Sequence, residues 1–259
     1  MKETCKKSGL SEPYPEFVAR FYDVIYAKVR SAADLDYYLR KIADTKGPVL
    51  EAGVGSGRLF IPALRGGADI YGIDISRTMI GVLHSKLNPR ERRRVRLGNI
   101  CSFRHSKKYQ LILAPFRVFS HLMTIDEQLQ ALTNLHRHLP PGGKLIFDLY
   151  VPNPKIIQEG FDHFRDFEGE YQPGKKLQRI ITSYSDIVRQ VTYVTMQFVW
   201  DAEDGVTSAE WHFSMRFYFR YELEHLLQRS PFKKFTIFGG FDESPLDTNS
   251  TEFVVVCGK

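Results

Sequence analysis

Cysteine residues and long apolar stretches are scarce in this chain. Its 259 residues include three widely spaced cysteines, Cys5, Cys101 and Cys257, and no C-x-x-C pair. This odd number argues against a disulfide framework or a cysteine zinc site. No apolar run approaches the roughly 18 residues that cross a bilayer, and residues 1–10 lack the apolar segment of a secretory signal. We therefore expect a cytoplasmic protein without a secretory leader or a membrane partner.

Several catalytic signatures are missing as well. The chain shows no phosphate-binding P-loop, no zinc quartet, no Ser-His-Asp signature and no internal repeat. We expect no metal site. With 43% hydrophobic residues, the length suffices for one α/β core with a small addition, and not for two large domains.

A glycine-rich turn is the most informative feature that the chain does have. Residues 49–57 read as a short apolar strand, the acid Glu51, and glycines at every second position: Gly53, Gly55 and Gly57. Such glycines let the backbone turn sharply and let a ligand approach closely. A second predicted strand, 69–74, ends in Asp74, 19 residues after Gly55, where a carboxylate can bind a ribose diol. This pair of features predicts a nucleoside-binding α/β domain.

The details of the turn disfavour a dinucleotide as the ligand. Arg58 stands where the last glycine of G-x-G-x-x-G belongs. The carboxylate of Glu51 would also repel a pyrophosphate, because like charges repel. It suits a ligand that carries a cationic amine and a sulfonium.

At this point the sequence resembles the class I S-adenosylmethionine-dependent methyltransferases, whose first motif is (Asp/Glu)-x-Gly-x-Gly-x-Gly. Residues 71–76 resemble the second motif of that family, with Asp74 on the ribose, and residues 95–100 resemble the third. Asn99 stands in place of the usual Asp near the adenine, and an Asn oxygen can still accept a hydrogen bond. Residues 136–148 resemble the helix, turn and fifth strand of the family's fold. The implied cofactor is S-adenosylmethionine, with S-adenosylhomocysteine as its product.

The resemblance also implies a set of cofactor-binding residues. They come from a helical lid, from the glycine-rich turn and from the ends of the following strands: Tyr22, Glu51, Gly53, Gly55, Gly57, Arg58, Asp74, Ile75, Met79, Asn99, Ile100, Pro115 and Phe116. The Asn/Asp-Pro-Pro-Tyr quartet of base-amine methyltransferases and the Pro-Cys nucleophile of cytosine-C5 enzymes are absent.

His121 is the candidate catalytic base. It follows the predicted strand 110–115, so it belongs to the carboxyl edge of the sheet, where ligands bind. The segment 115–122 is similar to a stretch of some sugar N-methyltransferases in which a histidine serves in catalysis or substrate positioning. Arg117 departs from that pattern. The alternative is a histidine that forms a structural hydrogen bond at a helix end.

The pattern of strands and helices predicts an α/β fold, with a Rossmann-like, seven-stranded, mostly parallel sheet, helices on both faces and a small antiparallel β insertion. Residues 1–150 would form the cofactor-binding core with an N-terminal helical lid, and residues 221–259 a last helix and a hairpin that completes the sheet. Between them, residues 151–220 would form the insertion, a substrate lid of three strands over 176–185, 188–200 and 206–219.

The role of the side chains on this insertion stays open. Trp200, Trp211, His212 and Arg216 either line a substrate cavity or pack in a core, because sequence does not fix the face of a strand. A β insertion at this place resembles small-molecule methyltransferases, including sugar N-methyltransferases.

We predict a methyltransferase that acts on a nitrogen or oxygen of a small-molecule acceptor, as a monomer or homodimer without a nucleic-acid partner. Two alternatives remain: a non-catalytic partner protein that binds S-adenosylmethionine or S-adenosylhomocysteine, and an RNA methyltransferase. The second would use residues 90–96, which hold five arginines in a chain of net charge +6. A solvated loop is the plain interpretation of that run.

Overall fold

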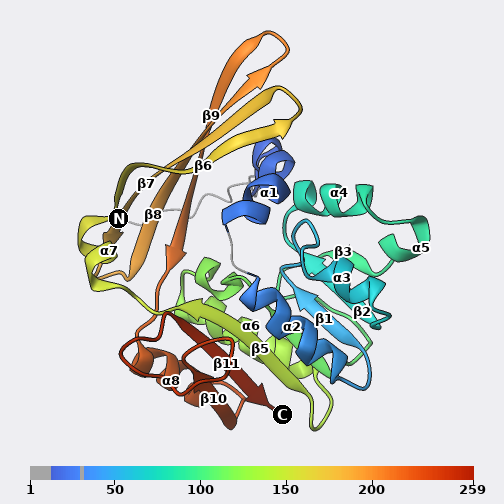
Figure 1. Ribbon diagram of the computed structural model, residues 1–259. Helices are drawn as coiled ribbons and strands as arrows, with labels where there is room; N and C mark the ends of the chain where they lie inside the picture. Colours follow the sequence, from blue (N-terminus) through green and yellow to red (C-terminus); the bar gives the residue numbers. More distant parts are fainter. Residues whose placement is uncertain (1–12, 30–31) are drawn as a thin grey trace, which may run out of the picture.

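Two β-sheets of different construction make up the described part of the chain (Figure 1). The computed structural model describes residues 13–29 and 32–259. The first sheet has seven strands in the spatial order β10, β11, β5, β4, β1, β2, β3. Their bounds are β1 Val49–Ala52, β2 Ile70–Asp74, β3 Val95–Leu97, β4 Leu111–Ala114, β5 Lys144–Tyr150, β10 Lys234–Phe238 and β11 Glu252–Gly258.

The first sheet is mostly parallel, as predicted. Strands β3, β2, β1, β4 and β5 run parallel, and β11 lies antiparallel between β5 and β10. Both β1 and β4 are buried along their whole length, which requires apolar residues on both faces. The strand order reverses between β1 and β4, and ligands of open α/β sheets bind beyond the carboxyl ends at such a place.

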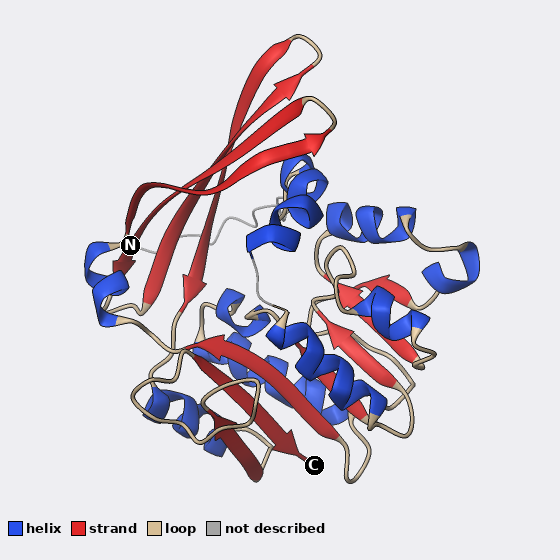
Figure 2. Cartoon of the chain, viewed as in Figure 1, coloured by secondary structure: helices blue, strands red, loops and turns tan. Residues whose placement is uncertain are grey.

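Helices cover both faces of the first sheet (Figure 2). Helices α2, α3 and α4 contribute to the hydrophobic cluster on one face, and α6 and α8 to the cluster on the other. The helices are α1 Glu16–Val29, α2 Ala33–Ala43, α3 Phe60–Arg65, α4 Arg77–Ser85, α5 Pro89–Arg92, the 3₁₀ helix η1 Val118–His121, α6 Ile125–His138, α7 Pro154–Glu159 and α8 Arg220–Arg229.

The second sheet is antiparallel and has four strands, β6 to β9 in chain order. Its strands are β6 Phe161–Gln172, β7 Lys175–Asp186, β8 Val191–Ala202 and β9 Gly205–Arg216. The prediction of three strands was wrong because β6 was missed. β6 is an edge strand with register shifts, and Phe167 is its only buried residue, so its sequence lacks the alternation that marks a half-buried strand.

The second sheet stands beyond the carboxyl ends of the parallel strands, with α1 packed against it (Figure 1). A buried cluster joins Val18, Phe21 and Ile25 of α1 to side chains of all four strands: Phe167, Leu177, Met196, Phe198 and Trp211. α1 also contacts α4, and β9 contacts η1. The second sheet and α1 therefore face the edge of the first sheet where a ligand would bind.

Local signals in the sequence match the structure at two places. Ser76 caps α4, since its hydroxyl accepts a hydrogen bond from the Met79 N–H, and Glu203 and Asp204 form the tight turn between β8 and β9. Among the described residues, no helix combines the length and apolar character that a membrane span requires.

Candidate functional site

The glycine-rich turn after β1 is packed too tightly for side chains. Gly53 has a φ of +86° and Gly57 a φ of +93°, in the left-handed region that favours glycine. A Cβ at Gly53 would lie 2.4 Å from Val118, and one at Gly57 would lie 2.4 Å from Leu83. The turn is therefore a bare backbone surface at the carboxyl end of β1.

Glu51 places a buried acid at the start of this turn. Its side chain is 3% exposed, and its Oε2 has no hydrogen-bond partner among the described residues. Burial raises the pKa of Glu51 well above its usual range, and the negative charge of Asp74 acts in the same direction while Arg58 opposes both. A buried carboxyl oxygen without a partner is costly, so the site favours a cationic or hydrogen-bond-donating group beside Glu51.

Asp74 ends β2 and is held in place by backbone donors. Its Oδ2 accepts the Gly55 N–H at 2.8 Å, and its Oδ1 accepts the Ser76 N–H at 2.8 Å. Ile75 beside it is 42% exposed, an unusual exposure for an isoleucine. A fixed carboxylate next to an exposed apolar side chain is the combination that a nucleoside's ribose and base need.

Three other predicted residues, Asn99, Met79 and Ile100, lie on neighbouring elements. Asn99 is exposed, and its Oδ1 accepts the N–H of Cys101 at 2.8 Å, so the side chain also shapes its own turn. Met79 is 2% exposed and Ile100 is 8% exposed, and both belong mainly to the packing beneath the site.

Phe116 brings together residues from three elements. Its ring centroid lies 6.4 Å from that of Tyr22 and 5.2 Å from that of Tyr26, both on α1. The guanidinium of Arg58 lies 5.4 Å from the same ring. Pro115, just before it, is buried. The structure thus joins the helix α1 to the loops after β1 and β4.

The turn that carries Phe116 is in a strained conformation. Phe116 and Arg117 have φ values of +62° and +63°, which cost residues other than glycine roughly 1–3 kcal/mol each. The buried carboxylate of Asp148 accepts both of their N–H groups, at 2.7 and 3.1 Å. Tyr38 donates its hydroxyl to the same carboxylate at 2.6 Å. Sequence reasoning missed Asp148, although an acid inside a buried strand was a visible signal.

His121 closes η1 directly after this turn. Its ring centroid lies 6.4 Å from that of Phe213 on β9. The side chain is exposed to solvent, yet the surrounding protein lowers the pKa of His121 through desolvation. His121 therefore lies between η1 and the second sheet, where solvent still reaches it. Because its pKa is lowered, it is neutral at pH 7.

The four candidate side chains of the insertion have different surroundings. Trp200 packs on α1, with its ring stacked 6.0 Å from Phe17, and Arg216 forms an ion pair with Glu222 at 2.7 Å. His212 is exposed and hydrogen bonded to Thr195. Trp211 stacks 4.1 Å from Phe213. Only this last pair continues toward His121.

The hydrogen bonds between α1 and the glycine-rich turn could not be predicted from the sequence. Ser56 donates its hydroxyl to Asp23 at 2.6 Å. Lys86, at the C-terminal end of α4, contacts both Asp23 and the Ser56 carbonyl. Tyr14, just before α1, accepts a hydrogen bond at its carbonyl from Thr78 at 2.5 Å. These contacts hold α1 over the turn.

No metal site is evident in residues 13–29 and 32–259, where no three His, Cys, Asp or Glu side chains gather in a suitable cluster.

Comparisons with known proteins place this geometry in a family. A family model described as a methyltransferase domain matches residues 49–143. An uncharacterized methyltransferase of Bacillus cereus is 31% identical over 168 residues, which are 61% of this chain and 76% of the relative. A second one, from Bacillus thuringiensis, is 37% identical over the same shares of both chains.

Solved structures share the fold. The sugar N-methyltransferase KedS8 from Streptoalloteichus is 15% identical, with a TM-score of 0.74 and coverage of 100% of this chain and 98% of that one. An S-adenosylmethionine-dependent methyltransferase from Clostridium acetobutylicum is 14% identical, with a TM-score of 0.72 and coverage of 94% and 97%. At this identity the likeness shows the fold alone. With the sequence matches and the glycine-rich turn, the conclusion is that the chain belongs to the class I S-adenosylmethionine-dependent methyltransferase family.

Proposed function

We propose that the protein transfers a methyl group from S-adenosylmethionine to a nitrogen or oxygen of a small molecule held under the second sheet. The observation that carries the proposal is a row of rings that runs from Tyr14, just before α1, to His121. Tyr14 lies 4.8 Å from Trp211 at a tilted angle, Trp211 stacks on Phe213 at 4.1 Å, and Phe213 lies 6.4 Å from His121, all between ring centroids. Burial and, next to it, the negative charge of Asp74 raise the pKa of Tyr14, so the row begins near Asp74.

The residues present fit the cofactor. Bound S-adenosylmethionine supplies an electrophilic methyl group on a sulfonium. Asp74 would accept hydrogen bonds from the ribose hydroxyls. The unpartnered oxygen of Glu51 would take a cationic group of the cofactor's amino-acid end. Ile75 and Phe116 would flank the adenosyl group.

The second sheet supports an acceptor of limited size. α1 contacts α4, and β9 contacts η1, so both elements would close the site from the side opposite the parallel strands. The aromatic row would exclude water from the reacting atoms and orient the acceptor. A neutral His121 would take the proton of an alcohol or ammonium acceptor as the new bond forms.

The proposed cofactor predicts a selective gain in stability. S-Adenosylhomocysteine at about one hundred times its dissociation constant should add about 2.7 kcal/mol, which raises Tm by roughly 5–10 °C for a chain of this length. NAD at the same concentration should leave Tm unchanged. Differential scanning fluorimetry tests this, and stabilisation by NAD alone would overturn the cofactor. Methyl transfer to an acceptor panel then distinguishes an enzyme from a non-catalytic binder.

Replacing Asp74 should weaken cofactor binding. Asp74→Ala removes charge-assisted hydrogen bonds worth roughly 1.5–3 kcal/mol, so calorimetry should show S-adenosylhomocysteine binding about ten- to a hundredfold weaker. Asp69→Ala is the matched control, because Asp69 precedes the same strand at its other end and pairs with Arg94. Equal affinity of the Asp74 variant and the wild type would remove Asp74 from the site.

Replacing Phe213 should affect the acceptor alone. Phe213→Ala deletes a ring between Trp211 and His121, and losing roughly 1–3 kcal/mol of apolar contact should raise the acceptor KM about tenfold. The dissociation constant of S-adenosylhomocysteine should stay within about twofold. Tyr184→Ala serves as the control, because Tyr184 is 65% exposed. A cofactor affinity that falls as much as the acceptor affinity would contradict a role in acceptor binding.

A further inference from the structure

Two neighbouring hollows lie on the side of the molecule where β3 forms the edge of the first sheet. The first, of about 410 Å³, lies between the loop after β3 and α6. The second, of about 120 Å³, lies between β2, β3 and the loop around residue 104. Arg104 lines both, so the two hollows lie side by side; together they are called here the β3 furrow. Neither contains Glu51, Asp74 or His121.

The β3 furrow is rich in arginines without acidic partners. Arg93, Arg96 and Arg104 line its second hollow, and Arg104 and Arg137 its first. Within the described part of the chain, none of these four arginines forms an ion pair with a carboxylate. By contrast, Asp69 beside the furrow is already neutralised by Arg94 at 2.6 Å and Lys107 at 3.7 Å. Asp126 lines the first hollow, and one lining carboxylate against four arginines leaves an excess of positive charge.

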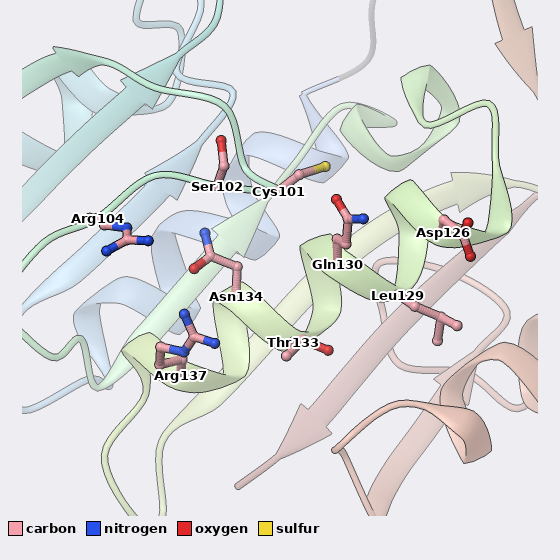
Figure 3. A pocket seen from close by; sticks show the side chains of 9 residues that line it. All are labelled: Cys101, Ser102, Arg104, Asp126, Leu129, Gln130, Thr133, Asn134 and Arg137. Carbon is pink, nitrogen blue, oxygen red and sulfur yellow. The ribbon is translucent and has the colours of Figure 1, made fainter.

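The charges also lie at one end of the first hollow. Figure 3 shows Arg104 on the loop and Arg137 on the last turn of α6, with Asp126 at the other end of the helix. In the second hollow, the pKa of His105 is lowered by burial and then by the positive charges of Arg96 and Lys107. His105 lines the second hollow, so the positive charges of Arg96 and Lys107 act within that hollow.

The chemistry of the furrow favours phosphate over a stacked base. Tyr71 is covered by Arg94 and Lys107, whose cationic groups lie 5.0 and 4.1 Å from its ring centroid. Tyr109 is 2% exposed. Neither ring offers a free face to a nucleobase, so the accessible groups are guanidiniums, whose planar donors match phosphate oxygens.

We propose that the β3 furrow binds the phosphates of a polyphosphate chain, either the backbone of a single-stranded nucleic acid or a free polyphosphate. Four arginines on two adjacent hollows offer contacts for several phosphates. The contacts would be independent of base sequence because they reach only the backbone. The inference does not depend on methyl transfer, since the furrow shares no residue with the Glu51, Asp74 and His121 site.

Two probes separate the two sources of phosphate. A labelled oligoribonucleotide of about 15 nucleotides is titrated with the protein by fluorescence anisotropy at several salt concentrations, and sodium tripolyphosphate is titrated by calorimetry. The double variant Arg96→Glu and Arg104→Glu should weaken binding at least tenfold. The slope of log K against log salt should become shallower by about 1.4, because two phosphate contacts are lost and each contributes about 0.7 on a single strand.

The control carries the same charge change on the opposite edge of the sheet. Arg229→Glu with Lys234→Glu lies at α8 and β10, and both residues are exposed. It should bind both probes within about twofold of the wild type. Unchanged Tm and S-adenosylhomocysteine affinity in both double variants show that the fold and the cofactor site are intact. For any variant that unfolds, Arg104→Gln and Arg137→Gln replace the reversals, each with an expected severalfold loss.

Each outcome decides the proposal. Binding of the oligoribonucleotide that tripolyphosphate does not displace assigns the furrow to a nucleic-acid backbone, and binding of tripolyphosphate alone assigns it to a free polyphosphate. No binding of either probe overturns the proposal. So does an equal loss in both double variants, because this would reflect the net charge of the chain and not the furrow.

Discussion

His121→Ala should lower the rate of methyl transfer by about 10²–10⁴-fold, the usual contribution of a general base. The side chain lies directly after the turn at Phe116 and Arg117 and opposite Phe213, so its loss would leave the acceptor's proton without a base. S-Adenosylhomocysteine affinity should change by less than about twofold, because the imidazole faces the second sheet. The measurement is single-turnover methyl transfer with an acceptor found in the panel.

The matched control is His212→Ala. His212 lies on β9, one residue before Phe213, but it is exposed and hydrogen bonded to Thr195 at 2.9 Å. Its replacement should leave turnover unchanged. If His121→Ala retains turnover within about twofold of the wild type, His121 has a structural role.

The pH profile gives a second test of the same residue. The neutral imidazole is the base, and desolvation lowers the pKa of His121. The rate should therefore be constant near pH 7 and fall as the pH drops through a value below the ordinary 6.5 of histidine. This acid limb should vanish in His121→Ala. A limb that persists unchanged would belong to the acceptor or to another group.

The geometry of the glycine-rich turn and Asp74 was predictable because the residues that determine it are close in the sequence. A glycine-rich turn between a strand and a helix fixes the local backbone, and the parallel fold then brings Asp74 beside Gly55 at 2.8 Å. The order of the seven strands follows from the same alternation of strands and helices. These features depend on local conformation and on a general topology.

The packing of the second sheet and α1 was less predictable because it depends on contacts between residues far apart in the sequence. The outcome at Trp200, Trp211 and Arg216 depended on which face of the second sheet packs on α1, and a strand pattern does not state this. The tie between Ser56 and Asp23 joins residues 33 positions apart. Such pairs are set by how α1 packs on the glycine-rich turn, so only the structure shows them.

Asp148 stabilises the turn after β4 that carries Phe116 and precedes His121. Its carboxylate accepts two consecutive N–H groups of residues in the left-handed region, together with the hydroxyl of Tyr38. Because positive φ at Phe116 and Arg117 is unfavourable, these hydrogen bonds stabilise a conformation that the two residues would otherwise leave. The same turn sets the start of η1, and therefore the position of His121.

Asp148→Asn should destabilise the protein and slow the reaction together. The amide keeps the shape but replaces one acceptor oxygen with a donor, which leaves a buried N–H unsatisfied and loses hydrogen bonds to a charged group, at about 3 kcal/mol in all. Thermal unfolding should show Tm lower by roughly 6–12 °C. At a temperature where the variant is folded, kcat should fall at least tenfold with little change in S-adenosylhomocysteine affinity, because a shifted turn misplaces His121 and spares Asp74. Tyr38→Phe is the control: it removes one hydrogen bond to the Asp148 carboxylate and leaves both turn contacts, so it should cost about 1.5–3 kcal/mol and preserve kcat. If both variants lower Tm but neither changes kcat, Asp148 stabilises the fold without positioning His121.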